Sequence, residues 1–246
     1  TSGLPTTGVS RLALAVTIDA PNTVYVLAGN SANQGFYGFY RSTDEGNNFS
    51  TMATSPNLLG WDINGADTGG QAWYDLTVAA DPNNADVVYV GGVNVWKTTD
   101  GGSTWALNAH WYGGGGAPYV HADHHGFNFV GNTSTLLIGC DGGVFKSNAT
   151  GSSYTDISSN LEIAQMYRLG VSQTNTTQVI SGWQDNGTNL KTGNNWSRVL
   201  GGDGFESIID HTNGNVMYGA IYYGSISKST NGGSGFSNIV GSNGTG

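Results

Sequence analysis

The sequence predicts an all-β chain assembled from five four-stranded units, and three observations predict it. Forty of the 246 residues are glycine and only 10% are charged, which disfavours helices because each internal glycine costs a helix about 1 kcal/mol relative to alanine. Aromatic residues make up 11% of the chain, enough to build a packed core. A pattern of an apolar residue, a basic residue and a hydroxyl residue, followed by a turn and an aromatic residue, recurs five times.

The recurring pattern sets the organisation of the chain. Its closing aromatic residues are Phe49, Trp105, Tyr154, Trp196 and Phe236, which are 56, 49, 42 and 40 residues apart. Upstream of each turn lie two apolar runs with strand periodicity, such as 12–19 and 23–27. Each unit is therefore expected to contain four strands. The units are expected over residues 6–55, 72–110, 120–159, 163–201 and 203–241.

The turn inside the unit has a physical explanation in its two clearest copies. These copies are Ser42, Asp44, Gly46 and Phe49, and Thr98, Asp100, Gly102 and Trp105. We expect the aspartates to accept hydrogen bonds from backbone N–H groups of the hairpin and the glycines to adopt positive φ. We expect the closing aromatic residues to pack between neighbouring sheets. These residues are thus predicted to be structural.

This turn resembles the Asp-box, or BNR repeat, of sialidases, sortilin-type receptors and family-74 xyloglucanases. Two good copies and three degenerate ones cover essentially the whole chain. The resemblance implies a β-propeller, in which about 4 to 8 four-stranded blades surround a channel, and it places the Asp-box away from the ligand face. Residues 3–5 look like the tail of a preceding blade, so we expect a propeller of about seven or more blades completed by the rest of a larger parent chain.

Four acidic, glycine-rich elements interrupt the repeat. They are His-Ala-Asp-His-His at 121–125, Cys-Asp-Gly-Gly at 140–143, Trp-Gln-Asp-Asn-Gly at 183–187 and Gly-Gly-Asp-Gly at 201–204. In this order they resemble large exported proteins of Bacteroidetes-type bacteria, which carry a sortilin-like or family-74-like propeller and often a type IX secretion sorting domain. The resemblance implies an extracellular or cell-surface location and leaves the activity open.

In register with the repeat, these elements lie at strand ends, where propellers commonly bind ligands. We expect a binding or adhesion face that recognises a polysaccharide or a cell-surface protein. The candidate ligand-binding residues are Asp123, His124, Asp141, Trp183, Asp185 and Asp203. The candidate aromatic platforms for sugar rings are Trp61, Trp73, Trp111, Tyr112 and Trp183.

Polysaccharide hydrolysis by a glycoside hydrolase is the alternative function. It requires two carboxyl groups placed across the scissile bond. Asp141, Asp185 and Asp203 are the catalytic candidates because each lies beside glycine, where a substrate approaches closely. The same Asp-Gly pairs are also ordinary turn formers. Binding and hydrolysis therefore both stay open at the level of the sequence.

Bound cations would suit either function. The candidate metal ligands are His121, Asp123, His125, Asp62 and Asp67. Alternation along a strand would place the first three on one face and His124 on the other. The two remaining aspartates belong to a segment with oxygen ligands at alternate positions, as calcium prefers. Calcium is favoured over zinc, and no other cofactor is expected.

Charge and composition exclude other classes of function. The net charge is −9, and five of the eight basic residues occupy the same repeat position. Nucleic acid is therefore not an expected partner, because phosphate binding needs clustered basic residues. No apolar run reaches about 18 residues, so no membrane insertion is expected. The single cysteine, Cys140, is expected to be a buried, inert thiol.

Overall fold

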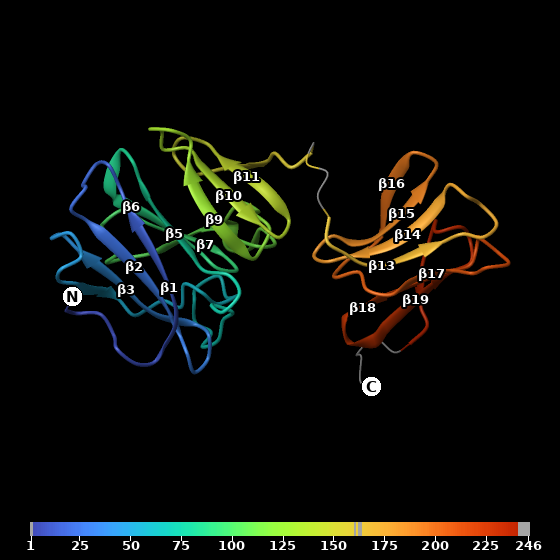
Figure 1. Ribbon diagram of the computed structural model, residues 1–246, viewed down its shortest axis with the longest axis horizontal. Helices are drawn as coiled ribbons and strands as arrows, with labels where there is room; N and C mark the ends of the chain where they lie inside the picture. Colours follow the sequence, from blue (N-terminus) through green and yellow to red (C-terminus); the bar gives the residue numbers. More distant parts are fainter. Residues whose placement is uncertain (1, 160, 162–163, 241–246) are drawn as a thin grey trace. The chain divides into compact units, whose positions relative to one another are not determined.

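The structure is a computed structural model that describes residues 2–159, 161 and 164–240. Its strands form five antiparallel four-stranded sheets, and each sheet is built from strands consecutive in the chain (Figure 1). Sheets of this kind are the blades of a β-propeller. The predicted all-β fold with four-stranded blades is confirmed.

The chain divides into two compact units, Thr1–Leu161 and Glu162–Gly246. The strands of the first unit are β1 (Val9–Val16), β2 (Val24–Asn30), β3 (Phe36–Ser42), β4 (Ser50–Ala53), β5 (Thr77–Asp81), β6 (Asn84–Gly91), β7 (Val95–Thr98), β8 (Ala106–Ala109), β9 (His124–Phe129), β10 (Leu136–Cys140), β11 (Gly143–Ser147) and β12 (Tyr154–Asp156). The strands of the second unit are β13 (Met166–Val171), β14 (Gln178–Trp183), β15 (Gly187–Thr192), β16 (Asn195–Leu200), β17 (Ser207–Ile209), β18 (Met217–Ile221), β19 (Ser225–Ser229) and β20 (Ser237–Asn238). The helical segments among the described residues are two 3-10 turns, η1 (Gly114–Gly116) and η2 (Tyr222–Gly224).

The core of each unit lies between neighbouring sheets. In β5, Val78 and Ala80 pack in the cluster shared with the first sheet, while Ala79 packs in the cluster shared with the third. The first cluster contains Tyr25, Leu27, Phe39, Val88, Val90 and Trp96, and the second contains Tyr89, Val95, Phe127, Leu136, Ile138 and Phe145. In the second unit, Ile180, Leu190, Ile209 and Met217 join the two sheets. The middle sheet of the first unit is therefore buried on both faces.

The predicted turn chemistry is present. The Asp100 carboxylate accepts hydrogen bonds from the backbone N–H groups of Ser103 and Thr104, both at 2.9 Å. The hydroxyl of Thr98 accepts the N–H of Gly102 at 3.1 Å. Hydrogen bonds, above all from the Thr104 side chain, lower the pKa of Asp100 to about 2. The carboxylate therefore serves as a permanent acceptor that closes the turn.

The first and last copies of the turn use the same contacts with small changes. Asp44 accepts the N–H of Asn48 at 2.9 Å. In the last copy Asn231 replaces the aspartate and accepts the N–H of Gly235 at 3.0 Å. An amide oxygen thus replaces the carboxylate because the turn requires an acceptor and not a charge.

The closing aromatic residue of the second copy joins two sheets as expected. The Trp105 ring, just before β8, meets the Phe39 ring of β3 edge-on, with centroids 4.9 Å apart. In the first copy Phe49 instead packs within the first sheet, beside buried Val26 and Tyr40.

Two of the repeated basic residues contact aromatic rings on the neighbouring strand. Lys97 lies over the Tyr89 ring, its cross-strand partner, at 5.2 Å from the centroid. Lys228 lies over Tyr218 in the same way at 5.6 Å. Cation–π contacts of this kind add about 0.5–1 kcal/mol at exposed sites. The basic residue therefore stabilises these two blades.

Two further findings bear on the expected elements. The unit expected over residues 163–201 begins with strand β13 at Met166, while Ile163 lies outside the described residues. No helix in the described part of the chain is long and apolar enough to cross a membrane.

Sheet register defines one edge that matters for function. In the second sheet, Thr77 at the start of β5 pairs with Gly91 at the end of β6. In the third sheet, His124 at the start of β9 pairs with Cys140 at the end of β10. We call the end of each sheet at which its first strand begins the leading edge. The turns that carry Asp44 and Asp100, between the third and fourth strands, lie at the opposite end.

Replacement of Gly102 by alanine tests the steric requirement of the turn. Gly102 has φ +103°, and a Cβ there would lie 2.4 Å from Phe39 ring carbons. We expect Gly102→Ala to lower the free energy of unfolding by about 2–4 kcal/mol in chemical denaturation, from backbone strain plus overpacking. Gly131, with φ +55° and no atom within 4 Å of the point where a Cβ would stand, is the matched control and should lose only about 1 kcal/mol. Equal losses would refute the packing argument.

Candidate functional site

The leading edge of the first unit brings together three segments that are distant in sequence. Residues 71–75 precede β5, residues 121–123 precede β9, and residues 141–142 form the turn between β10 and β11. They meet because β5 and β9 are the adjacent first strands of neighbouring sheets. We call the side chains of Gln71, Tyr74, Asp75, Asp123, His125 and Asp141 the carboxyl cluster.

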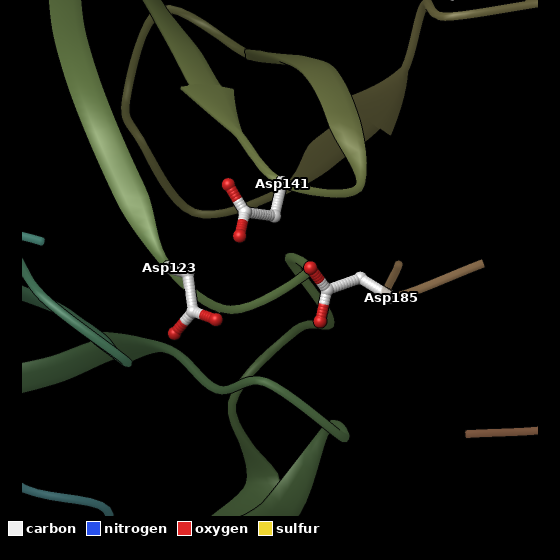
Figure 2. Close-up of side chains that lie close together, drawn as sticks. All are labelled: Asp123, Asp141 and Asp185. Atoms are coloured by element: carbon white, nitrogen blue, oxygen red, sulfur yellow. The ribbon is translucent and has the colours of Figure 1, made fainter. Parts of the chain in front are cut away.

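Asp123 and Asp141 are neighbours because of the strand register. They flank the paired residues His124 and Cys140, and the Asp141 N–H donates to the Asp123 carbonyl at 3.2 Å. Asp123 has φ +63°, at a point where the ladder is irregular. Figure 2 shows the two side chains, one just before β9 and the other just after β10. One carboxylate oxygen of each lies within 4.8 Å of the other.

Asp141 receives two strong hydrogen bonds. The Tyr74 hydroxyl donates to its Oδ2 at 2.5 Å, and His125 Nε2 lies 2.7 Å from its Oδ1. The Tyr74 and His125 rings also meet edge-on, with centroids 4.9 Å apart. Arg11 Nη1 donates to the Tyr74 carbonyl at 2.9 Å and so holds this segment against the first sheet. Each carboxylate oxygen of Asp141 therefore lies within hydrogen-bond distance of a side chain.

Asp75 and Asp123 form a second pair of carboxyl groups. Gln71 Nε2 donates to Asp75 Oδ2 at 3.0 Å and also donates to Asp123 Oδ1. Asp75 is fully buried, and its Oδ1 has no hydrogen-bond partner among the described residues. Burial, followed by the charge of neighbouring Asp123, raises the pKa of Asp75. Burial and the charge of Asp141 raise the pKa of Asp123.

The remaining residues of 121–125 and 140–143 have different surroundings. His124 points into the core, where its Nδ1 contacts the Gly92 carbonyl and burial lowers its pKa to about 4. The His121 ring is partly buried and packs where a Cβ on Gly142 would stand. Burial raises the pKa of the Cys140 thiol to about 12, in keeping with an inert thiol. Asp123, His125 and Asp141 of these elements lie in the carboxyl cluster, and the charge of His121 acts to lower the pKa of Asp123.

Exposed aromatic side chains also lie on the leading edge of the first unit. Trp73 is 67% exposed, and its ring centroid lies 5.4 Å from that of Tyr74. Trp61 and Trp111 are also exposed. Both are held by buried Asn94 in the β6–β7 turn, whose amide donates to the Trp61 carbonyl at 3.2 Å and accepts the Trp111 N–H at 3.4 Å. One buried side chain therefore orders two aromatic loops.

Asp62 and Asp67 do not form a second cluster. Asp67 Oδ2 accepts the Trp61 N–H at 2.6 Å, and its Oδ1 lies 3.4 Å from the Asn57 amide. Asp62 is exposed. Asp67 therefore orders the loop that carries Trp61.

The second unit contains the other predicted residues. The Asp203 carboxylate accepts the Asp185 N–H at 2.9 Å, so these two elements are joined at the leading edge of their own unit. Asp185 has φ +56°. Trp183 is partly buried and its ring lies 5.4 Å from that of Trp196. All of these contacts lie within the second unit.

Sequence reasoning missed Gln71, Tyr74 and Asp75. The signal for Asp75 is its position, because it lies just before the first strand of its unit, as Asp123 does in the next unit. Gln71 and Tyr74 carry no comparable signal, since a turn and the packing of two sheets bring them to the cluster.

Comparison with known proteins gives remote likenesses in structure. No family model and no curated protein matches the chain. A GH74 enzyme of Niastella koreensis has 21% identity and a TM-score of 0.44, covering 94% of this chain and 38% of its own. A GH74 xyloglucanase of Xanthomonas campestris has 17% identity and a TM-score of 0.46, covering 95% and 38%. YCF48 of Cyanidioschyzon merolae has 13% identity and a TM-score of 0.35, covering 96% and 86%. The chain thus spans 38% of the length of either GH74 enzyme, and the fold assignment rests on the sheets themselves.

The carboxyl cluster predicts a pH-dependent stability in metal-free buffer. Because the pKa of Asp75 is raised in the folded state, the folded chain binds a proton that the unfolded chain releases above about pH 4. The free energy of unfolding should therefore fall as the pH rises from about 5 to about 8. In urea denaturation with EDTA, Asp75→Asn should flatten this fall.

The control is Asp86→Asn, which removes an exposed carboxylate paired with Arg41 near the opposite end of the second sheet. Asp86→Asn should keep the wild-type slope. An Asp75→Asn variant with the same slope as the wild type would show that the buried carboxyl does not titrate in this range.

Proposed function

We propose that the chain is an extracellular carbohydrate-binding propeller that holds a polysaccharide along the leading edge of its first three blades. The observation that carries the proposal is the position of Trp73, a largely exposed indole directly beside the Tyr74–Asp141–His125 contacts. Sugar rings present apolar faces that stack on aromatic rings and hydroxyl groups that hydrogen-bond to carboxylates. The leading edge offers both kinds of contact within one surface.

The aromatic loops extend this surface beyond the carboxyl cluster. Trp61 and Trp111 are 43% and 40% exposed, and Tyr112 is 62% exposed. Their loops are fixed by hydrogen bonds to Asn94 in the turn of the second sheet. A fixed platform loses little conformational entropy on binding. A chain of several sugar units suits such a surface better than a single small ligand, and a cell-surface protein is the other partner to be tested.

Trp73→Ala tests the binding function. On a panel of soluble polysaccharides, we expect the wild type to bind at least one, and Trp73→Ala to weaken that binding at least tenfold, or about 1.4 kcal/mol. Trp73→Phe should retain most of the affinity because it keeps an aromatic platform. Asp86→Asn, far from the leading edge, should bind as the wild type does.

Failure of every polysaccharide to bind, or full affinity in Trp73→Ala, would contradict this function. Binding of a cell-surface protein in place of a polysaccharide would assign the leading edge to protein adhesion.

Glycoside hydrolysis is a second candidate function that one observation favours. Asp123 and Asp141 have oxygens within 4.8 Å, close to the carboxyl separation of about 5–5.5 Å in retaining enzymes. Their surroundings also differ: burial and the Asp141 charge raise the pKa of Asp123, while Asp141 receives a tyrosine hydroxyl and a histidine. A carboxyl group with a raised pKa beside a carboxyl group that hydrogen-bonds to polar side chains is the arrangement of an acid and a nucleophile.

Release of reducing ends tests the second candidate. If the chain hydrolyses a polysaccharide, Asp123→Asn and Asp141→Asn should each lower kcat/KM by about 10²–10⁴-fold while the chain still binds the polysaccharide. Asp86→Asn should leave the rate unchanged. Binding without any release of reducing ends would reject hydrolysis and leave carbohydrate binding as the function.

A further inference from the structure

Two exposed tyrosines form the turn between β18 and β19 in the second unit. Tyr223 is 78% exposed and Tyr222 is 47% exposed, and their rings meet edge-on with centroids 5.4 Å apart. The pairing of the first two strands of this sheet continues to the Phe205 N–H, which donates to the Ala220 carbonyl at 2.8 Å. The tyrosine turn therefore lies at the leading edge of the last sheet.

The chemistry of the turn does not by itself require a tyrosine at position 223. Tyr223 has φ +59° and ψ +26°, in the left-handed region that bulky residues rarely adopt. The corresponding turn of the preceding sheet, between β14 and β15, has Asp185 at φ +56°, and aspartate tolerates this conformation. Glycine or aspartate would therefore make the turn with less strain. Backbone strain of this kind is concentrated at sites that bind ligands.

The Tyr222 ring packs against one of the acidic, glycine-rich elements, residues 201–204. A Cβ on Gly202 would lie 3.1 Å from a carbon of the Tyr222 ring, so the ring contacts the backbone of this element closely. The Asp203 carboxylate in the same element accepts the Asp185 N–H at 2.9 Å. The tyrosine turn is thus held against a segment that is itself hydrogen-bonded to the neighbouring sheet.

The surroundings of the tyrosine turn are acidic. Asp203 follows the glycine against which Tyr222 packs, and the Glu206 carbonyl accepts the Ala220 N–H at 2.8 Å at the same edge. Arg168 Nε is paired with the Glu206 carboxylate at 3.2 Å. An anionic ligand is therefore disfavoured at this edge. A neutral sugar suits it, because its apolar face stacks on an aromatic ring and its hydroxyl groups hydrogen-bond to polar side chains.

We propose that Tyr222 and Tyr223 form a second sugar-binding site, which takes a neutral sugar unit of a polysaccharide at the leading edge of the second unit. Tyr223 supplies the exposed ring that stacks on the sugar, and Tyr222 holds that ring in place through the edge-on contact. The site is separate from the carboxyl cluster and from Trp73, which belong to the first unit. It rests on the proposed function in taking the same class of ligand.

Binding of soluble polysaccharides by the full chain tests the second site. With β-glucan, galactomannan and arabinoxylan as probes, Tyr223→Ala should weaken the binding of the polysaccharide that the wild type binds by about fivefold or more. Tyr223→Phe should retain most of the affinity, because it keeps the ring. The matched control is Val171→Ala, which removes an exposed apolar side chain at the opposite end of the sheet that β13 begins. This control should bind as the wild type does.

Tyr223→Gly separates ligand binding from a structural role of the side chain. Glycine adopts the left-handed region freely, so this variant should melt at the wild-type temperature or above it, while it binds as weakly as Tyr223→Ala does. In the wild type, nitration of Tyr223, followed by mass spectrometry, should slow when the polysaccharide is bound. Loss of binding only together with a lower melting temperature, or nitration at an unchanged rate, would overturn the second site.

Trp73→Ala, measured beside Tyr223→Ala, distinguishes the second site from the proposed function. Weaker binding in Trp73→Ala with unchanged binding in Tyr223→Ala would overturn the second site and keep the binding surface of the first unit. Weaker binding in Tyr223→Ala with unchanged binding in Trp73→Ala would keep the second site and reject the surface of the first unit. A wild type that binds none of the three polysaccharides would reject both.

Discussion

Burial of apolar side chains between neighbouring sheets is the constraint on which the rest of the structure depends. Strand β5 shows this most clearly, because Val78 and Ala80 face one neighbouring sheet and Ala79 faces the other. A single four-stranded sheet of this composition would leave one or both apolar faces in water, at a cost of roughly 25 cal/mol per Å². The same packing aligns the first strands β5 and β9, and so brings the segments at their leading edges into contact. The carboxyl cluster is a consequence of that alignment.

The two ends of the sheets use aspartate in opposite ways. At the end opposite the leading edge, Asp100 accepts backbone and side-chain hydrogen bonds that hold its pKa at about 2. At the leading edge, Asp75 is buried with one oxygen unpartnered, and its pKa is raised. Donors to the charged form account for the first case and desolvation for the second. A carboxyl group that stabilises a turn and a buried one with a raised pKa thus differ in surroundings and not in residue type.

On the leading edge, buried polar side chains hold loops whose aromatic side chains are exposed to solvent. Asn94 is fully buried and fixes the loops of Trp61 and Trp111 from below, while the indoles themselves stay exposed. The Asp67 carboxylate accepts a hydrogen bond from the Trp61 N–H and so stabilises the same loop. Buried polar residues that hold exposed aromatic ones in place make a surface ready for a ligand before the ligand arrives.

Strand periodicity and turn chemistry predicted the four-stranded units, the hydrogen bonds of Asp44 and Asp100 and the positive φ of Gly102 from the sequence. These features depend on strand periodicity and on contacts within a turn or a hairpin, which short stretches of sequence specify. Only the tertiary structure decided that Asp75, Gln71 and Tyr74 join the cluster, that His124 lies in the core and that lysines lie over tyrosines. The physical reason is that burial of a side chain, and hence its charge state and its neighbours, depends on how one sheet packs against the next.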